Sequence, residues 1–229
     1  MDDTVTNHLS PTVEDYLKAI YTLTEEDRTA STSSLAKSLN SHPSSVTGMI
    51  KRLASLGYLE HLPYKGVQLT EKGSKEALRI IRRHRILETY LQKNLEYTWA
   101  EVHEEAELLE HAVSDKLIAR MAKVLGDPTH DPHGAPIPTT SGKISAVHSM
   151  TLLDVSPGAS ARIEAVQDED PAKLQYLEVL GLTPGTHVQI IQRTSFDQST
   201  TVTKSREDDV PITISRELAV DIFVSTSNE

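Results

Sequence analysis

The chain of 229 residues contains no cysteine. Disulfide bonds, thiolate metal sites and a cysteine nucleophile are therefore excluded, and any metal ion must be held by histidine, carboxylate, amide or backbone oxygen. The sequence also lacks an apolar run of about 18 residues and the short apolar core of a signal peptide, so we expect a soluble, cytoplasmic protein. A chain of this length can form one or two domains with substantial cores.

The net charge is −10, but the charges are unevenly distributed along the chain. Residues 42–94 contain ten Lys or Arg against four acidic residues, a net charge of +6, so the rest of the chain carries −16. A basic segment within an acidic protein predicts contact with nucleic acid. The acidic excess elsewhere is of the kind that a divalent cation would partly neutralise.

Side chains that bind metals are concentrated in residues 103–111, HEEAELLEH. On a helix, His103, Glu107, Glu110 and His111 would share one face beside an apolar stripe. Imidazole and carboxylate groups together are ligands for a divalent transition metal. A solvated acidic face with two incidental histidines is the alternative interpretation, and this segment alone does not decide between them.

The N-terminal third has the pattern of a winged helix-turn-helix. Ser10 and Pro11 begin a helix that runs to about residue 23, and two short helices, at 33–39 and from residue 43, flank a tight turn. Residues 58–69 alternate as a hairpin with Lys65 at its tip, where a lysine suits a phosphate. The outer faces of the second short helix present small hydroxyl groups and a lysine that can reach bases and phosphates, Ser44, Ser45, Thr47 and Lys51. An ordinary helical hairpin capped by serine is the alternative.

The middle of the chain is predicted to be helical. Residues 70–95 form a long helix, and the arginines of this helix extend the basic segment. His84 lies on or beside the apolar stripe of the helix, as a hydrogen-bonded core histidine would. A further helix at 114–125 has more apolar residues than a two-helix hairpin needs, which is consistent with a dimer interface. Residues 126–142 form a linker rich in Pro and Gly, and its His130 and His133 are interpreted as exposed loop histidines.

From residue 144 the pattern changes to short alternating strands. The clearest are at 150–153, 161–166, 187–191 and 212–214, with a short helix at 173–180 and a helical turn at 216–219. This pattern predicts a small β-barrel of the SH3-like kind. No residue in this part has a catalytic pattern.

Motifs along nearly the whole chain resemble those of the metal-dependent transcriptional regulators typified by the diphtheria toxin repressor and the manganese transport regulator. They are VEDYLKAIY at 13–21, HPSSVT at 42–47, RRHRILE at 82–88, HEEAELLEH at 103–111, DPHGAPIP at 131–138, LQYLEVLGLTPG at 174–185 and ISRELA at 214–219. The resemblance implies a mainly α chain in three parts. These are a winged helix-turn-helix DNA-binding domain at 1–72, a helical metal-binding and dimerisation domain with a Pro-rich linker at 73–142, and a small C-terminal SH3-like (FeoA-like) β-barrel at 143–229.

The resemblance also implies two metal sites. The principal site would use Asp15, Glu107, Glu110 and His111. The ancillary site would use His84, Glu88 and His103, with a further ligand from the C-terminal domain, for which Asp170 is the first choice and Gln175 the second. His42 and Pro43 belong to the motif that resembles the recognition helix, and they join the predicted DNA contacts.

Two of these positions indicate the metal. The iron-sensing branch of the family has Met where Asp15 stands and Cys where Glu107 stands. Carboxylate oxygen suits Mn(II) better than sulfur does, so the resemblance implies a manganese sensor, with Fe(II) as the alternative ion. Lys18 stands where the two-domain manganese regulators have a carboxylate, which argues against a closely spaced metal pair. Asp131 and Ala135 replace residues that contact a bound anion in the diphtheria-type repressor, so that anion is not expected here.

The function implied is that of a metal-dependent transcriptional regulator of metal homeostasis, in which metal favours binding of a homodimer to a palindromic operator. Repression is what the family resemblance implies, and activation is the alternative. We do not expect an enzyme. Two rival hypotheses remain. One is a metalloenzyme, because two sites of histidine and carboxylate can activate water. The other is a winged-helix regulator that answers an organic ligand and works without metal.

Overall fold

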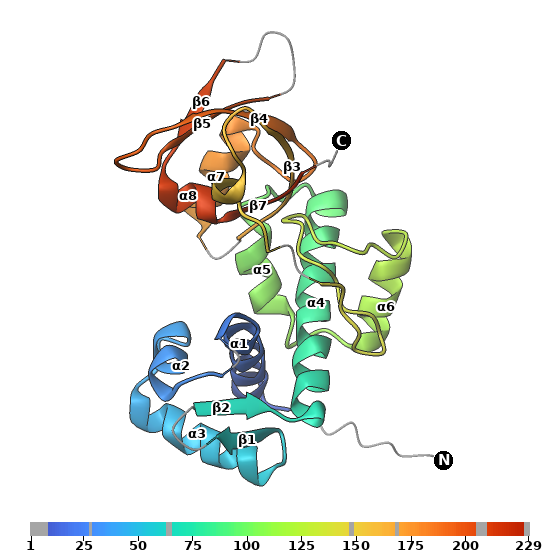
Figure 1. Ribbon diagram of the computed structural model, residues 1–229. Helices are drawn as coiled ribbons and strands as arrows, with labels where there is room; N and C mark the ends of the chain where they lie inside the picture. Colours follow the sequence, from blue (N-terminus) through green and yellow to red (C-terminus); the bar gives the residue numbers. More distant parts are fainter. Residues whose placement is uncertain are drawn as a thin grey trace. The chain divides into compact units, whose positions relative to one another are not determined.

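The computed structural model describes residues 9–27, 29–62, 66–146, 149–167, 170–204 and 210–226, and the chain divides into two compact units (Figure 1). The first unit comprises Met1–Arg83, Glu110–Ala112 and Pro138–Ile144. The second comprises His84–Leu109, Val113–Ile137 and Ser145–Glu229. Among the described helices, none is both long and apolar enough to cross a membrane.

The first unit contains a helix-turn-helix followed by a two-stranded antiparallel hairpin. Its elements are α1 (Pro11–Asp27), α2 (Thr32–Ser38), α3 (Pro43–Ser55), β1 (Leu59–Leu62), β2 (Gly66–Leu69) and the first half of α4 (Glu71–Leu95). Ser31 caps α2 through a capping box, and His42 caps α3 with Pro43 in its first turn. The predicted helices and hairpin are therefore present. The hairpin tip, with the predicted phosphate contact Lys65, lies outside the described residues.

One apolar core holds α1, α2, α3 and the hairpin together. Leu17 and Ile20 of α1, Leu35 of α2 and Leu53 of α3 are fully buried in it, as apolar residues at helical spacing require. The opposite face of α3 is exposed. It carries all the predicted DNA contacts that the structure describes, His42, Pro43, Ser44, Ser45, Thr47 and Lys51.

The helical part of the second unit contains the rest of α4, α5 (Val102–Leu109) and α6 (Asp115–Val124). The prediction that residues 103–111 share one helix face is wrong, because α5 ends at Leu109 and Glu110 and His111 lie in the following turn. Ser114 then caps α6 by accepting a hydrogen bond from the Leu117 amide. The break assigns the two halves of the motif to different units.

The C-terminal part is a five-stranded antiparallel sheet with strand order β6-β5-β4-β3-β7. Its elements are a 3-10 turn η1 (Leu152–Asp154), β3 (Ser160–Val166), α7 (Pro171–Leu180), β4 (His187–Arg193), β5 (Thr200–Lys204), β6 (Ile212–Ile214), α8 (Arg216–Val220) and β7 (Ile222–Ser225). The predicted barrel is not closed, because β6 and β7 are edge strands and do not pair in the described chain. The strand predicted at 150–153 is also wrong. Thr151 forms one bridge with Phe223, and the chain then enters η1.

The segment predicted as a linker is ordered and packs within the second unit over residues 131–137. The Val166 amide donates to the His133 carbonyl, and a Cβ at Gly134 would lie 2.0 Å from the Glu164 carbonyl oxygen. Gly134 also has φ +90°, so glycine is required there on both counts. The single tryptophan, Trp99, is buried in the core of the sheet domain and donates from Nε1 to the Pro132 carbonyl. These contacts bury the DPHG motif against β3.

Candidate metal centres

The first candidate centre lies in the first unit and joins α1 to the turn after α5. Asp15, Glu110 and His111 each place a ligand atom within 4.8 Å of the others. His111 Nε2 lies 2.8 Å from Asp15 Oδ1 and 3.5 Å from Glu110 Oε1. Glu110 is buried, whereas 44% of the Asp15 side chain is exposed, so the group is open on one side. Two carboxylates and an imidazole at this spacing fit a hard divalent cation.

Three further charged side chains lie around this centre, and the sequence had not indicated them as part of it. Glu14 Oε2 accepts a hydrogen bond from His111 Nδ1 at 2.7 Å, and Glu14 Oε1 lies 3.5 Å from the guanidinium of buried Arg83. Lys18 donates from Nζ to both carboxylate oxygens of Glu110, at 3.1 and 2.9 Å. Glu14 lies beside the apolar stripe of α1, and a carboxylate at that position was the signal available in the sequence.

The surroundings of Asp15 change its affinity for protons. Burial raises the pKa of its carboxyl group, and the charge of Glu110 raises it further. His111 and Lys18 lower the pKa, but the net shift is upward. A divalent cation at this position would favour the ionised carboxylate, so metal and proton compete for Asp15.

Glu107, the fourth ligand predicted for the principal site, belongs to the second unit. Its carboxylate lies 3.7 Å from Nε2 of His103, one turn earlier on α5. The side chain is 57% exposed. Its place in the principal site stays a prediction.

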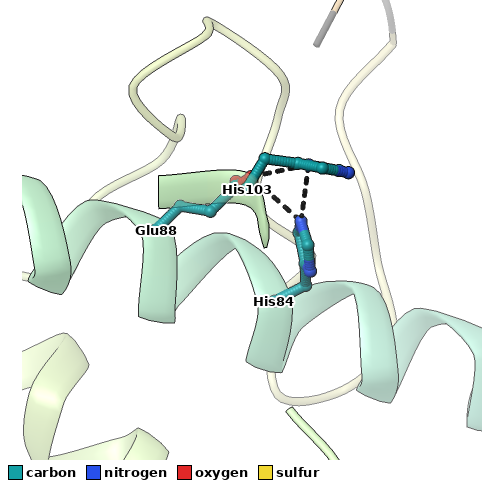
Figure 2. Close-up of side chains that lie close together, drawn as sticks. All are labelled: His84, Glu88 and His103. Carbon is teal, nitrogen blue, oxygen red and sulfur yellow. Dashed lines mark hydrogen bonds and ion pairs between the residues drawn. The ribbon is translucent and has the colours of Figure 1, made fainter. Parts of the chain in front are cut away.

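The second candidate centre lies in the second unit, where His84 and Glu88 on α4 face His103 on α5 (Figure 2). Oε1 of Glu88 lies 2.9 Å from His84 Nε2 and 3.2 Å from His103 Nδ1. The two histidine nitrogens are 3.2 Å apart. His84 and Glu88 are buried, as expected of residues one turn apart on an inward face of a helix.

Glu88 also faces the DPHG motif, which extends this centre. Asp131, His133 and Glu88 form a second group of possible ligands, all buried. His133 donates from Nε2 to the Trp99 carbonyl at 2.9 Å, which in a neutral imidazole leaves the lone pair on Nδ1, 3.9 Å from Glu88 Oε1. The interpretation of His133 as an exposed loop histidine is therefore wrong. It was missed because its burial depends on contacts with β3, where the amide of Val166, 33 residues further along the chain, donates a hydrogen bond to the His133 carbonyl.

The surroundings of Glu88 favour the ionised form of its carboxyl group despite its burial. Burial by itself raises the pKa of its carboxyl group, but the charges and hydrogen bonds of His84, His103 and His133 outweigh this effect and hold the pKa well below its ordinary value. Its second oxygen, Oε2, is buried and has no hydrogen-bond partner among the described residues. An ionised carboxylate with one unsatisfied buried oxygen fits a site for a cation.

The two ligands predicted from the C-terminal domain lie at the start of α7 and on α7 itself. Asp170 caps α7, where Oδ1 accepts hydrogen bonds from the amides of Ala172 and Lys173. Gln175 is exposed on the same helix. Asp170 belongs to none of the groups of His, Asp and Glu side chains that could hold a metal among the described residues. The structure places the buried carboxylate of Asp131 next to Glu88.

The arginines of α4, interpreted from the sequence as part of a basic surface, have partners within the chain. Arg82 donates to the Pro138 carbonyl, and Arg85 donates to the Pro136 carbonyl and lies 3.3 Å from Asp131. Arg79 pairs with Glu76, and Arg83 pairs with Glu14. These four arginines therefore make contacts within the fold.

Comparison with known proteins gives three consecutive family matches. The N-terminal DNA-binding domain of the iron-dependent repressors matches residues 8–67, their metal-binding and dimerisation domain matches residues 70–139, and the FeoA domain matches residues 150–226. A solved manganese-dependent transcriptional repressor in complex with manganese is 35% identical, with a TM-score of 0.85 over 93% of this chain and 99% of that one. The chain belongs to the iron-dependent repressor family.

Members of this family are metal-dependent, DNA-binding transcriptional repressors, and relatives of both metal types resemble this chain. The iron-dependent repressor IdeR of Mycobacterium leprae is 31% identical over 187 residues, which cover 82% of this chain and 73% of IdeR. The regulator MntR of Shouchella clausii is 37% identical over 116 residues, which cover 51% of this chain and 80% of MntR. The family resemblance of the sequence motifs is thus confirmed, and with it the helical DNA-binding and dimerisation domains and the C-terminal FeoA sheet.

Proposed function

We propose that this iron-dependent repressor family member is a cytoplasmic, manganese-responsive repressor that binds a palindromic operator as a homodimer when its metal sites are filled. The observation that carries the proposal is the cluster of Asp15, Glu110 and His111, which offers only oxygen and nitrogen ligands. Mn(II) binds weakly in the divalent series, and hard carboxylate oxygen is the donor that favours it. Fe(II) is the second candidate, because the chain also resembles IdeR.

In this proposal, the principal site is formed by the cluster in the first unit together with Glu107. The ancillary site is formed by His84, Glu88 and His103, with Asp131 and His133 at hand and Asp170 or Gln175 as further ligands from the C-terminal domain. The buried Glu88 Oε2, which has no hydrogen-bond partner among the described residues, supports the ancillary site. A divalent ion would add positive charge to the carboxylates clustered at each site.

The proposed mechanism depends on the core that α1 shares with α3. Asp15 projects from α1, whose apolar face packs in one core with the face of α3 opposite its exposed residues. Glu110 and His111 directly follow α5 of the dimerisation domain. A metal ion bound by Asp15 together with Glu110 and His111 would tether α1, and therefore α3, to the dimerisation domain. Two recognition helices must be about 34 Å apart to enter successive major grooves, so a tether that narrows their range favours DNA binding.

The dimer in this proposal uses apolar side chains of the helical domain. Leu117 and Val124 on α6 are two turns apart on one side of the helix, and 42% and 68% of their surfaces are exposed. Leu108 on α5 is 75% exposed. Exposed apolar residues at helical spacing are typical of a subunit interface.

We propose domain boundaries of 1–72, 73–142 and 143–229.

Titration of the metal-free protein with Mn(II), Fe(II) and Zn(II), in the presence of fluorescent duplexes from promoter regions of the source genome, tests the function. We expect fluorescence anisotropy to rise only with metal, and Mn(II) to act at the lowest free concentration. A lower threshold for Fe(II) would identify an iron sensor. Equal DNA binding in chelator and in every metal would contradict the proposal and favour a metal-independent winged-helix regulator.

Replacing Lys51 by alanine should weaken DNA binding at every sequence without changing metal affinity. Lys51 is exposed on α3, where its ammonium group would neutralise a phosphate and release a counterion. The slope of log affinity against log salt should therefore become shallower by about one in the variant. Lys93→Ala, an exposed lysine at the end of α4, is the matched control. An unchanged salt slope would remove Lys51 from the interface.

A further inference from the structure

The two nitrogens of His111 face different carboxylates of α1. Nδ1 lies 2.7 Å from Glu14 Oε2, and Nε2 lies 2.8 Å from Asp15 Oδ1. Successive residues on a helix point about 100° apart, so neighbouring carboxylates can lie at the two nitrogens of one ring. Only the Nε2 side is also shared with Glu110, at 3.5 Å. The ring therefore has one nitrogen on the side of the candidate metal centre and one on the side of the protein interior.

Glu14 is unlike Asp15 in its surroundings. Its side chain is 6% exposed, against 44% for Asp15, and its other oxygen lies 3.5 Å from Arg83. Arg83 is itself only 3% exposed and comes from α4. A buried carboxylate is costly unless it is paired, and Arg83 provides the compensating charge. Glu14 is thus held in place on the side of the ring away from the open face of the centre.

We propose that Glu14, anchored by Arg83, is a positioning residue that sets the tautomer and orientation of His111 for metal binding. This inference rests on the proposed function, since it concerns the same principal site. A carboxylate only accepts hydrogen bonds, so Glu14 retains the ring proton on Nδ1 and leaves the lone pair of Nε2 for the cation. A carboxylate behind a ligating histidine also makes the imidazole a stronger ligand.

The competing explanation is that Glu14 and Arg83 only fasten α1 to α4 as a buried ion pair. The double variant Glu14→Leu/Arg83→Met separates the two. It removes both charges and keeps similar apolar volume, a replacement that buried ion pairs often tolerate without loss of stability. A purely structural pair would then be replaced without consequence for metal binding. If Glu14 is a positioning residue, the same double variant should bind metal more weakly, because leucine cannot accept a hydrogen bond from Nδ1.

The test is Mn(II) affinity of the full-length protein, measured without DNA by competition with a fluorescent chelator. The binding step that disappears in His111→Ala identifies the principal site. We expect the double variant to bind Mn(II) about 10- to 100-fold more weakly at that step, with its dimer and thermal midpoint retained. Glu14→Gln, which keeps an acceptor oxygen without the charge, should give a smaller loss. Glu60→Gln, an exposed glutamate on β1, is the control and should bind as the wild type does.

A second measurement reports the ring directly. In protein labelled with 15N-histidine and loaded with diamagnetic Zn(II), the His111 Nδ1 proton should be visible and slow to exchange in the wild type, and absent in the double variant. Unchanged Mn(II) affinity together with an unchanged Nδ1 signal in the folded double variant would overturn the inference. If that variant does not fold, unchanged affinity in Glu14→Gln would overturn it. Failure of the wild type to bind any metal would instead refute the proposed function.

Discussion

Replacing His111 by alanine is expected to abolish metal-stimulated DNA binding while leaving the homodimer intact. Among the described residues, the imidazole is the nitrogen ligand of the first candidate centre and lies between Asp15 and Glu110, so its loss leaves two carboxylates without the group that connects them. Allosteric coupling between two ligands reaches about 100-fold in affinity, and that is the loss we expect at a metal concentration that saturates the wild type.

Fluorescence anisotropy with an operator duplex measures the DNA affinity of His111→Ala, and analytical ultracentrifugation measures the dimer. His187→Ala is the matched control, because His187 is exposed on β4 of the sheet domain. If His111→Ala bound the operator as tightly as the wild type in the same metal, the first centre would not be the switch. Loss of the dimer would show that the residue is needed for assembly.

Replacing Trp99 by alanine is expected to destabilise the second unit by about 3–5 kcal/mol. The indole is 3% exposed and packs with the core of the C-terminal sheet. Its Nε1 donates to the Pro132 carbonyl, and the Trp99 carbonyl accepts from His133. Truncation would therefore leave a cavity and loosen the segment that carries two of the buried groups beside Glu88. Metal affinity of the ancillary site should fall as well.

Guanidinium unfolding followed by circular dichroism measures this loss without the tryptophan signal. Trp99→Phe keeps most of the apolar volume but loses the hydrogen bond, so its cost should be smaller. Tyr176→Ala removes an aromatic ring that is 46% exposed on α7, and serves as the control. A cost for Trp99→Ala as small as that of Tyr176→Ala would mean that the indole does not tie the helical segment to the sheet.

Local sequence patterns predicted the elements of the N-terminal domain closely. The first helix, the two short helices and the hairpin each depend on interactions within a few residues, such as the Ser31 capping box, the cap by His42 and the buried spacing of Val46, Ile50 and Leu53. These signals act over short distances and survive without knowledge of the fold. The C-terminal domain was predicted less well, because the pairing order and edges of a sheet depend on long-range contacts.

The metal-binding motif shows where local patterns fail. Periodicity alone placed four residues of 103–111 on one helix, but the chain breaks after Leu109 and divides them. Glu14 and His133 contact the candidate ligands, but neither is spaced from them in the sequence in a way that periodicity could detect. Glu14 lies 97 positions from the ring it contacts, and His133 is buried by a strand that follows it. No periodic pattern within one segment reports on partners so distant in sequence.

The sequence by itself determined the family, the order of the domains and most of the candidate ligands, because motifs, caps and apolar periodicity are properties of short segments. The tertiary structure alone decided which ligands lie together and what surrounds them. It paired His111 with both Glu14 and Asp15, set Lys18 against Glu110, and brought Asp131 and His133 to Glu88. Such groupings follow from the packing of α1, α4 and β3 with segments far along the chain, and the electrostatics of a site depend on every charge so assembled.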